Sequence, residues 1–150
     1  MATAIERYIN SLSNDIVNLD IHIHDITYLP DLTRFHKLKR LYCYGNKLTS
    51  LPTLPQNLTT LYCRNNQLTS LPTLPENLEE LVCSNNQLTS LPTLPKNLTK
   101  LYCHTNQLTS LPTLPENLKE LYCSNNQFTS LPSLPENLVF DCGISLEAKL

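Results

Sequence analysis

The chain has 150 residues, a formal net charge of −2 and a pI near 6.0. It therefore lacks the strong positive field with which general nucleic-acid-binding proteins attract phosphates, and we expect no nucleic-acid partner. No apolar stretch reaches the roughly 18 to 20 residues that span a bilayer, and the N-terminal sequence MATAIERYINSLSND lacks a signal-peptide hydrophobic region. We expect a soluble chain with no membrane contact that is not secreted through a cleavable N-terminal signal.

The first predicted element is a helix over residues 3–14. Thr3 and Glu6 have the spacing of a capping box, in which two side chains satisfy the free N–H groups of a helix start. An apolar stripe at helical spacing follows, formed by Ile5, Tyr8, Ile9 and Leu12. We expect this helix to cap the first repeat of the domain.

A unit close to L-x-x-L-x-C-x-x-N-x-L-T-S-L-P-x-L-P-x-N then returns every 20 residues, starting at Leu38, Leu58, Leu78, Leu98 and Leu118. A period of about 20 to 29 residues with this leucine spacing is typical of a leucine-rich repeat solenoid, in which each coil buries its leucines against its neighbours. Residues 16–37 fit the pattern with a two-residue insertion, and 138–150 lose its register by one residue. We predict a single domain over 1–150: the capping helix 3–14, a divergent first repeat 16–37, five repeats 38–137 and a degenerate C-terminal cap 138–150.

Within one unit, alternation predicts a strand with one buried side. Leu41 and Cys43 point inward, whereas Arg40, Tyr42 and Tyr44 point outward. The prolines that follow exclude a helix or a central strand, so the return segment is predicted to be extended or polyproline-like. The fold class is thus a solenoid with a parallel concave β-sheet and an extended convex side.

One asparagine of each turn is invariant, at positions 46, 66, 86, 106 and 126. We expect its amide to bond the turn backbones of its own and adjacent coils, where an unpaired partner would be costly. In the divergent first repeat His24 takes this slot, and we interpret it as a substitute hydrogen-bonding group.

Five of the six cysteines share one inward register, at positions 43, 63, 83, 103 and 123. Buried cysteine behaves as a small apolar residue, so a ladder of free thiols is favoured over disulfides or a metal site. Cys142, in the degenerate end, is expected to be the most exposed thiol. It has no histidine near it in sequence to activate it.

Repeats such as LPTLPENLEELVCSNNQLTSLP closely resemble the short leucine-rich repeats of bacterial type III secreted effectors of the YopM and IpaH kind. Similar cysteine-bearing repeats resemble those of giant DNA viruses that infect amoebae. The resemblance covers residues 16 to about 140. It implies a pathogen or viral factor that binds a protein on its concave face in the cytoplasm, the host cell cytoplasm if it is viral or an effector. Effectors of the IpaH kind continue into a ubiquitin-ligase domain, so a repeat fragment of such a ligase is one alternative.

Outward positions vary between repeats and are therefore not dictated by the stack. Their tyrosines, arginines and mixed charges are typical of a protein-binding surface. The predicted partner-binding residues are Arg40, Tyr42, Tyr44, Tyr62, Arg64, Tyr102, His104 and Tyr122. The alternative interpretation is that tyrosines on adjacent strands only support the sheet.

No phosphate loop, paired acid motif or metal-ligand set appears in the sequence, so we predict a non-enzymatic module without catalytic residues, metal or cofactor. His22 and His24 alone are too few ligands for a metal site. We expect a monomer. The alternative is a self-associating structural protein that dimerises through a C-terminal edge blunted only by Glu147 and Lys149.

Overall fold

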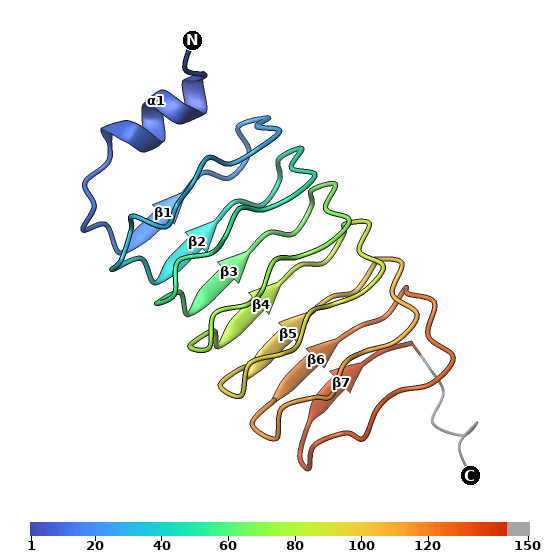
Figure 1. The fold of residues 1–150 in the computed structure, drawn as a ribbon. Coiled ribbons are helices and arrows are strands. Elements are labelled where there is room, and N and C mark those ends of the chain that lie inside the picture. The colour runs from blue at the N-terminus through green and yellow to red at the C-terminus, as the bar shows by residue number, and fades with distance from the viewer. Residues whose placement is uncertain (144–150) are drawn as a thin grey trace.

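The computed structural model describes residues 1–143 as an elongated solenoid, with one short strand in each coil (Figure 1). Helix α1 (Ala4–Ser11) lies beside the first coil, at the opposite end of the stack from β7. The strands are β1 (Asn18–Asp20), β2 (Arg40–Tyr42), β3 (Thr60–Tyr62), β4 (Glu80–Val82), β5 (Lys100–Tyr102), β6 (Glu120–Tyr122) and β7 (Val139–Asp141). Over the described residues they form one parallel sheet in chain order. The predicted fold class is confirmed.

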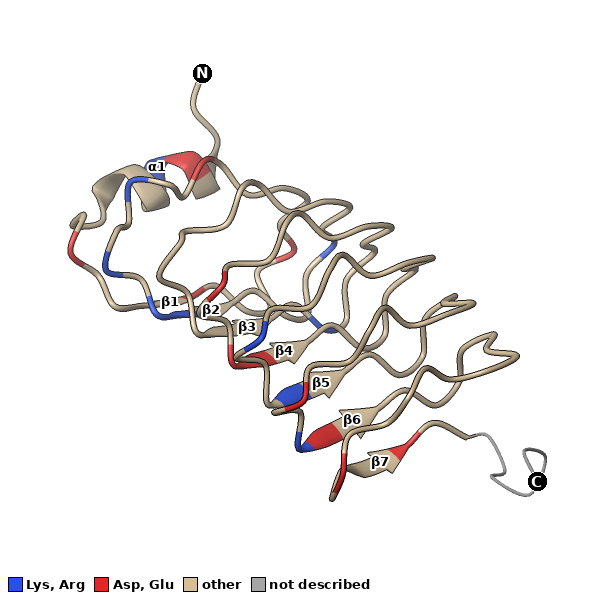
Figure 2. Ribbon diagram, turned by 60° about the horizontal axis from the view of Figure 1, so that its bottom comes forward, with Lys and Arg blue, Asp and Glu red and all other residues tan. Residues whose placement is uncertain are grey.

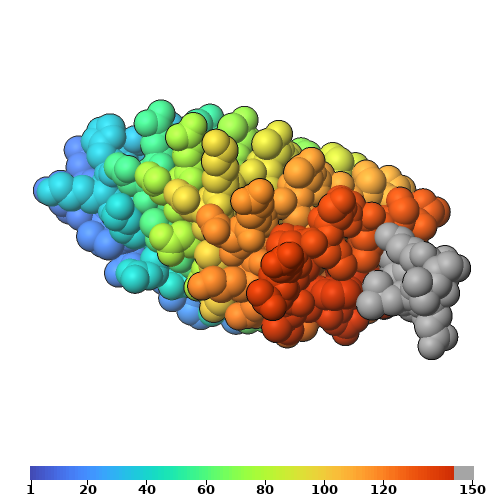
Figure 3. All heavy atoms as spheres, turned by 90° about the horizontal axis from the view of Figure 1, so that it is seen from below, coloured from blue at the N-terminus to red at the C-terminus, as the bar shows by residue number. Residues whose placement is uncertain are grey.

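In the sheet, residues at the same position of successive repeats lie side by side on adjacent strands. Leu41 pairs with Leu61, and Tyr42 pairs with Tyr62. The leucine at the centre of each of the strands β1 to β6 is buried. So are the leucine three positions before it in the coils of β2 to β6 and the leucine that follows the turn in the coils of β2 to β5. Each coil therefore shares its core with the next, and the successive coils form bands along the length of the molecule (Figure 3). The described part of the chain has no helix long and apolar enough to cross a membrane.

The asparagine ladder forms as predicted. The Nδ2 of Asn66 donates to the carbonyl oxygens of Cys63 in its own coil (3.1 Å) and Cys43 in the preceding one (3.0 Å). Its Oδ1 accepts from the backbone N–H of Leu48 at 3.0 Å. Asn86, Asn106 and Asn126 repeat this arrangement. Each amide thus joins two coils through backbone groups that would otherwise be unpaired.

The residue before each of these asparagines occupies a left-handed backbone conformation, with positive φ at Gly45, Asn65, Asn85, Thr105 and Asn125. We call this position the left-handed slot. Glycine and asparagine tolerate it better than other residues, which explains their prevalence there. In the first coil the corresponding residue is Ile23, with a φ of 53°.

The two-residue insertion of the first repeat falls next to Phe35, which is fully buried. Beside it the guanidinium of Arg34 donates to the carbonyl oxygens of Ile9 (2.6 Å) and Leu12 (3.2 Å), at the C-terminal end of α1. At the other end of the helix, the predicted capping box of Thr3 and Glu6 is formed. The cap helix is therefore secured at both ends.

The cysteines differ in part from the prediction. Four remain buried free thiols: Cys43, Cys63, Cys83 and Cys103. Burial raises the pKa of the Cys43 thiol to about 12 and leaves these groups unreactive. Cys123, however, forms a disulfide with Cys142 of β7's coil, with the two Cα atoms 4.3 Å apart.

This disulfide corrects the prediction of an unbroken thiol ladder. The predicted one-residue slip is present, because Leu121 pairs with Phe140 in the register between β6 and β7. The same slip brings Cys142 opposite Cys123, within bridging distance. Cys142 is 6% exposed and the other five cysteines are 0%, so it is the most exposed cysteine, as predicted, but it is bonded to Cys123 and is not a free thiol. Glu147 and Lys149, predicted to blunt the C-terminal edge, lie outside the described residues.

Candidate protein-binding surface

The outward face of the sheet carries three columns of side chains that the repeat does not dictate. The first column holds Arg40, Thr60, Glu80, Lys100 and Glu120; the central column holds Tyr42, Tyr62, Val82, Tyr102 and Tyr122; the third holds Tyr44, Arg64, Ser84, His104 and Ser124. Figure 2 shows the charges of the first column alternating in sign at the amino ends of β4, β5 and β6. All eight residues predicted to bind a partner lie on this face.

The tyrosines of the central column are paired and held by carboxylates. Tyr42 packs edge-on against Tyr62, with 5.2 Å between ring centroids, and Tyr102 packs in the same way against Tyr122 at 4.8 Å. The hydroxyl of Tyr62 donates to the carboxylate of Glu80 (2.9 Å). Tyr102 makes the equivalent bond to Glu120 (2.5 Å). These contacts fix the rings in place and reduce the entropy that a partner would have to remove.

The same contacts alter the acidity of two hydroxyls. Burial, together with the hydrogen bond to Glu80, raises the pKa of Tyr62 to about 12. The hydrogen bond to Glu120, together with burial, raises the pKa of Tyr102 to about 12. Both hydroxyls remain protonated donors at any physiological pH.

We therefore expect an alkaline titration followed by tyrosinate absorbance to show two tyrosines that ionise late. Tyr62 and Tyr102 should ionise near pH 12, well above the ordinary tyrosine pKa of about 10. Because their folded pKa is raised, the stability they contribute is complete below about pH 10 and is lost as the pH rises toward 12. Tyr62→Phe should remove one late-titrating group, and Tyr122→Phe should leave both. A single transition near pH 10 would contradict the two carboxylate bonds.

The third column begins with a stack of planar groups. The imidazole of His22 stacks on the ring of Tyr44, with 4.7 Å between centroids and 15° between planes. The guanidinium of Arg64 lies 4.9 Å from the centroid of the same ring. His22 is in turn bound through Nδ1 to the carboxylate of Asp20. Burial alone would raise the pKa of Asp20, but the hydrogen bonds from His22 outweigh it and the pKa is lowered.

Strand β4 divides the surface into two halves. Val82 is 8% exposed and Ser84 2%, because both are small and stand between larger neighbours. On one side lie the Tyr42–Tyr62 pair and Arg64, and on the other lie the Tyr102–Tyr122 pair and His104. The predicted binding residues therefore form two groups separated by the small side chains of Val82 and Ser84.

Three residues of this surface were missed in the sequence prediction. Glu80 and Glu120 fix the tyrosines, and His22 extends the stack on Tyr44. Each glutamate lies 18 residues after the tyrosine that it binds. In a 20-residue repeat, this spacing places the glutamate on the next strand and in the first column, beside the central column that holds the tyrosine. Arg40, which was predicted, donates to Asn18 at 3.1 Å near the start of the sheet.

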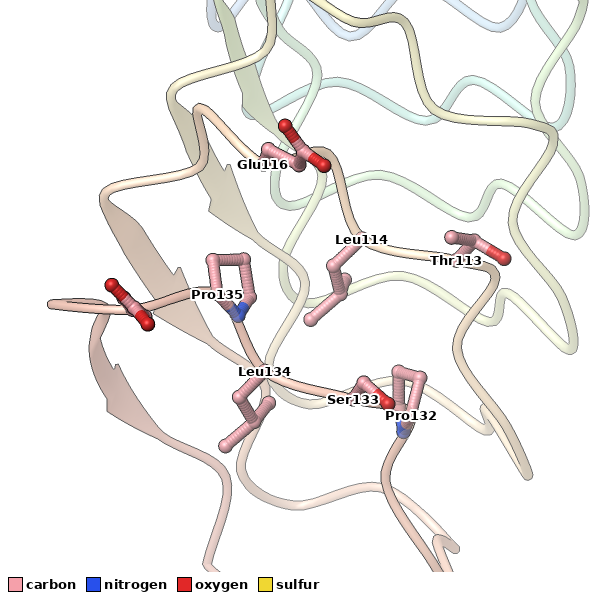
Figure 4. Close-up of a pocket in the computed structure, with 8 residues that line it drawn as sticks. Thr113, Leu114, Glu116, Pro132, Ser133, Leu134 and Pro135 are labelled. Carbon is pink, nitrogen blue, oxygen red and sulfur yellow. The ribbon is translucent and has the colours of Figure 1, made fainter.

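A groove on the convex side is part of the scaffold. It lies between the last two described return segments, where Leu114, Leu134, Pro132 and Pro135 line it together with Thr113 and Glu116 (Figure 4). The same repeat slots, Thr53, Leu54, Thr73, Leu74 and Pro75, line an equivalent groove near the other end of the solenoid. Because this groove recurs with the repeat, it does not indicate a site for a specific ligand.

A second cavity lies between α1 and the first coil, lined mainly by Ile5, Tyr8, Ile21 and Ile26. His24 lines it as well, in the slot that asparagine fills in later coils. Its side chain makes no hydrogen bond to a described residue, so its interpretation as a substitute turn bond is wrong. The backbone N–H of His24 donates to the Oδ1 of Asn46 in the next coil at 2.9 Å.

The repeat, the parallel sheet and the asparagine ladder together define the class of this protein: the chain belongs to the leucine-rich repeat family. The family model described as "Leucine Rich repeats (2 copies)" matches residues 56–95 and 76–116, and "Leucine Rich Repeat" matches 117–138. No curated protein sequence matches the chain. Leucine-rich repeat domains are in general non-catalytic modules that bind proteins.

Solved structures similar to this chain include leucine-rich repeat domains of bacterial effectors. YopM from Yersinia enterocolitica is 35% identical with a TM-score of 0.77 over 88% of this chain and 34% of its own. A Shigella effector leucine-rich repeat domain is 31% identical with a TM-score of 0.78 over 87% of this chain and 67% of its own. A Leptospira interrogans leucine-rich repeat protein is 29% identical with a TM-score of 0.59, over 79% and 40%. The chain thus spans about a third of the length of the Yersinia protein.

Proposed function

We propose that this chain is a non-enzymatic interaction module that binds a protein partner on the outward face of its sheet. The residues proposed to contact the partner are Arg40, Tyr42, Tyr44, Tyr62, Arg64, Tyr102, His104 and Tyr122. The observation that carries the proposal is the pair of tyrosine couples held by Glu80 and Glu120. The repeat does not require these side chains, and rigid tyrosines provide contact area at small entropic cost.

We further propose that the protein acts as a pathogen or viral factor in the cytoplasm of a host cell. Support comes from the neighbours, since the Shigella domain and the Yersinia pestis YopM structure are both described as effectors. In a reducing cytoplasm Cys123 and Cys142 would be thiols, and Cys142 would pack as the last apolar member of the cysteine column. That the repeats belong to a longer ubiquitin-ligase effector is a second proposal of the same kind.

The alternative function is that of a structural protein that self-associates through its C-terminal edge. One observation favours it: Val139 is 59% exposed on β7, the last strand of the described sheet. Sedimentation of the full chain over a range of concentrations tests it. A mass that stays monomeric throughout removes this alternative.

Capture of partners from a host-cell extract tests the main proposal. The double variant Tyr62→Ala/Tyr102→Ala is expected to retain its fold and to lose at least about tenfold in partner recovery, because two central anchors are removed. Thr53→Ala/Thr113→Ala, two exposed changes on the convex side, serves as the matched control and should bind as wild type. Equal recovery of the same partners by both double variants would show that the tyrosines only support the sheet.

A further inference from the structure

Ile23 occupies a backbone conformation that its side chain disfavours. Its φ is 53°, in the left-handed region where a β-branched residue is a strained outlier. The corresponding slot holds glycine or asparagine in four of the five later coils that have positive φ there. Such strain persists where something other than folding favours the residue.

The Ile23 side chain is 69% exposed, so burial in the core does not compensate for the strain of its backbone. The next coil accommodates it: Gly45 lies directly opposite, and a Cβ there would be 2.9 Å from the Ile23 Cγ1. The Ile23 backbone N–H also donates to the carbonyl oxygen of Tyr44 at 3.1 Å. A large apolar side chain is therefore held outward at the edge of the His22–Tyr44–Arg64 stack.

Arg64, at the other end of this stack, has an unpaired positive charge. Its guanidinium is exposed and lies over Tyr44, and no described carboxylate forms an ion pair with it. Two acids of the first coil are engaged with other groups, since Asp20 is bound by His22 and Asp25 by Lys47. Glu80 is likewise bound, by Tyr62 and Lys100. This edge thus offers one apolar contact and one free cation, which complement an apolar and an acidic group.

We propose that Ile23, His22, Tyr44 and Arg64 form the anchor of the interface, occupied by an extended protein segment that sets a large apolar side chain on Ile23 and a carboxylate on Arg64. This inference rests on the proposed function and names the partner's chemistry. Two strand spacings separate the first and third coils, about 10 Å, which is close to three residues of extended chain. The two anchoring residues of the partner are therefore about three positions apart.

One substitution should change stability and binding in opposite directions. Ile23→Asn places at the slot the residue that later coils carry, so it should raise the midpoint of thermal unfolding while it weakens binding. Arg64→Gln should weaken binding without a matching loss of stability. Val139→Thr removes a comparably exposed apolar side chain at the far end of the sheet and should change neither.

The experiment is a selection of random peptides, about 12 residues long and so able to cross the sheet, displayed on phage against the wild-type chain. We expect enrichment of sequences with a large apolar residue about three positions from Asp or Glu. Synthetic copies should lose at least about tenfold in affinity for both Ile23→Asn and Arg64→Gln. Binding to Val139→Thr should be unchanged.

Other outcomes overturn the inference in distinguishable ways. Peptides that lose affinity for Tyr62→Ala/Tyr102→Ala but bind Ile23→Asn and Arg64→Gln as wild type would leave the proposed function intact and remove this anchor. Peptides whose affinity is unaffected by every substitution on the sheet face would overturn both the anchor and the proposed function. Enrichment of basic sequences, no enrichment above the starting library, or a lower unfolding midpoint for Ile23→Asn would also overturn the anchor.

Discussion

Asn66→Ala is expected to destabilise the chain by about 3 kcal/mol or more, because it leaves several buried backbone groups without partners. The Asn66 amide bonds Cys43 and Cys63 through Nδ2 and Leu48 through Oδ1, and no water can reach these groups easily since the side chain is buried. Each unpaired buried group costs about 1–3 kcal/mol. Alanine can replace none of these bonds.

Urea unfolding followed by circular dichroism measures the effect. Gln67→Ala, one residue on and exposed, is the matched control and should change the free energy of unfolding by less than about 0.5 kcal/mol. Because coils contact only their neighbours, the Asn66 variant should also unfold over a broader range as the stack separates into two parts. A loss below about 1 kcal/mol would mean that the backbone groups find other partners.

The asparagine ladder shows why so much of the fold could be predicted. A residue that never changes between repeats reports a demand of the stack, and Asn66 meets the same three backbone groups as its equivalents. The capping box at Thr3 was equally predictable, because it depends only on local spacing. Both features follow from contacts that the sequence repeats or keeps close together.

Other features depend on geometry that the repeat hides. The bonds from Tyr62 to Glu80 and from Tyr102 to Glu120 cross between columns and depend on the rotamers of long side chains. The Cys123–Cys142 disulfide depends on the distance between these two side chains across β6 and β7, which the predicted one-residue slip allows but does not fix. The strain at Ile23 depends on a backbone angle that the repeat pattern does not specify.

The second large effect is expected at Gly45, where alanine should destabilise the chain by about 2 kcal/mol. The φ of Gly45 is 69°, which strains an L-residue with a Cβ by about 1–2 kcal/mol. The new Cβ would also lie 2.9 Å from the Cγ1 of Ile23, so the exposed isoleucine would have to move. Urea unfolding of the variant and the wild type measures the sum of the two effects.

Gly45→Asn separates these effects, because asparagine tolerates the backbone angle but still brings a Cβ toward Ile23. In the Ile23→Asn background this contact is absent, and Asn65 and Asn85 show that two asparagines fit at this slot in successive coils. Gly45→Asn should therefore reduce the free energy of unfolding less in the Ile23→Asn background than in the wild type, with a coupling energy of about 1 kcal/mol. Strictly additive costs would show that Gly45 serves its own turn alone. Coupling would instead mean that Ile23 and Gly45 act as a pair, in which the glycine makes room for an apolar group that the fold itself does not need.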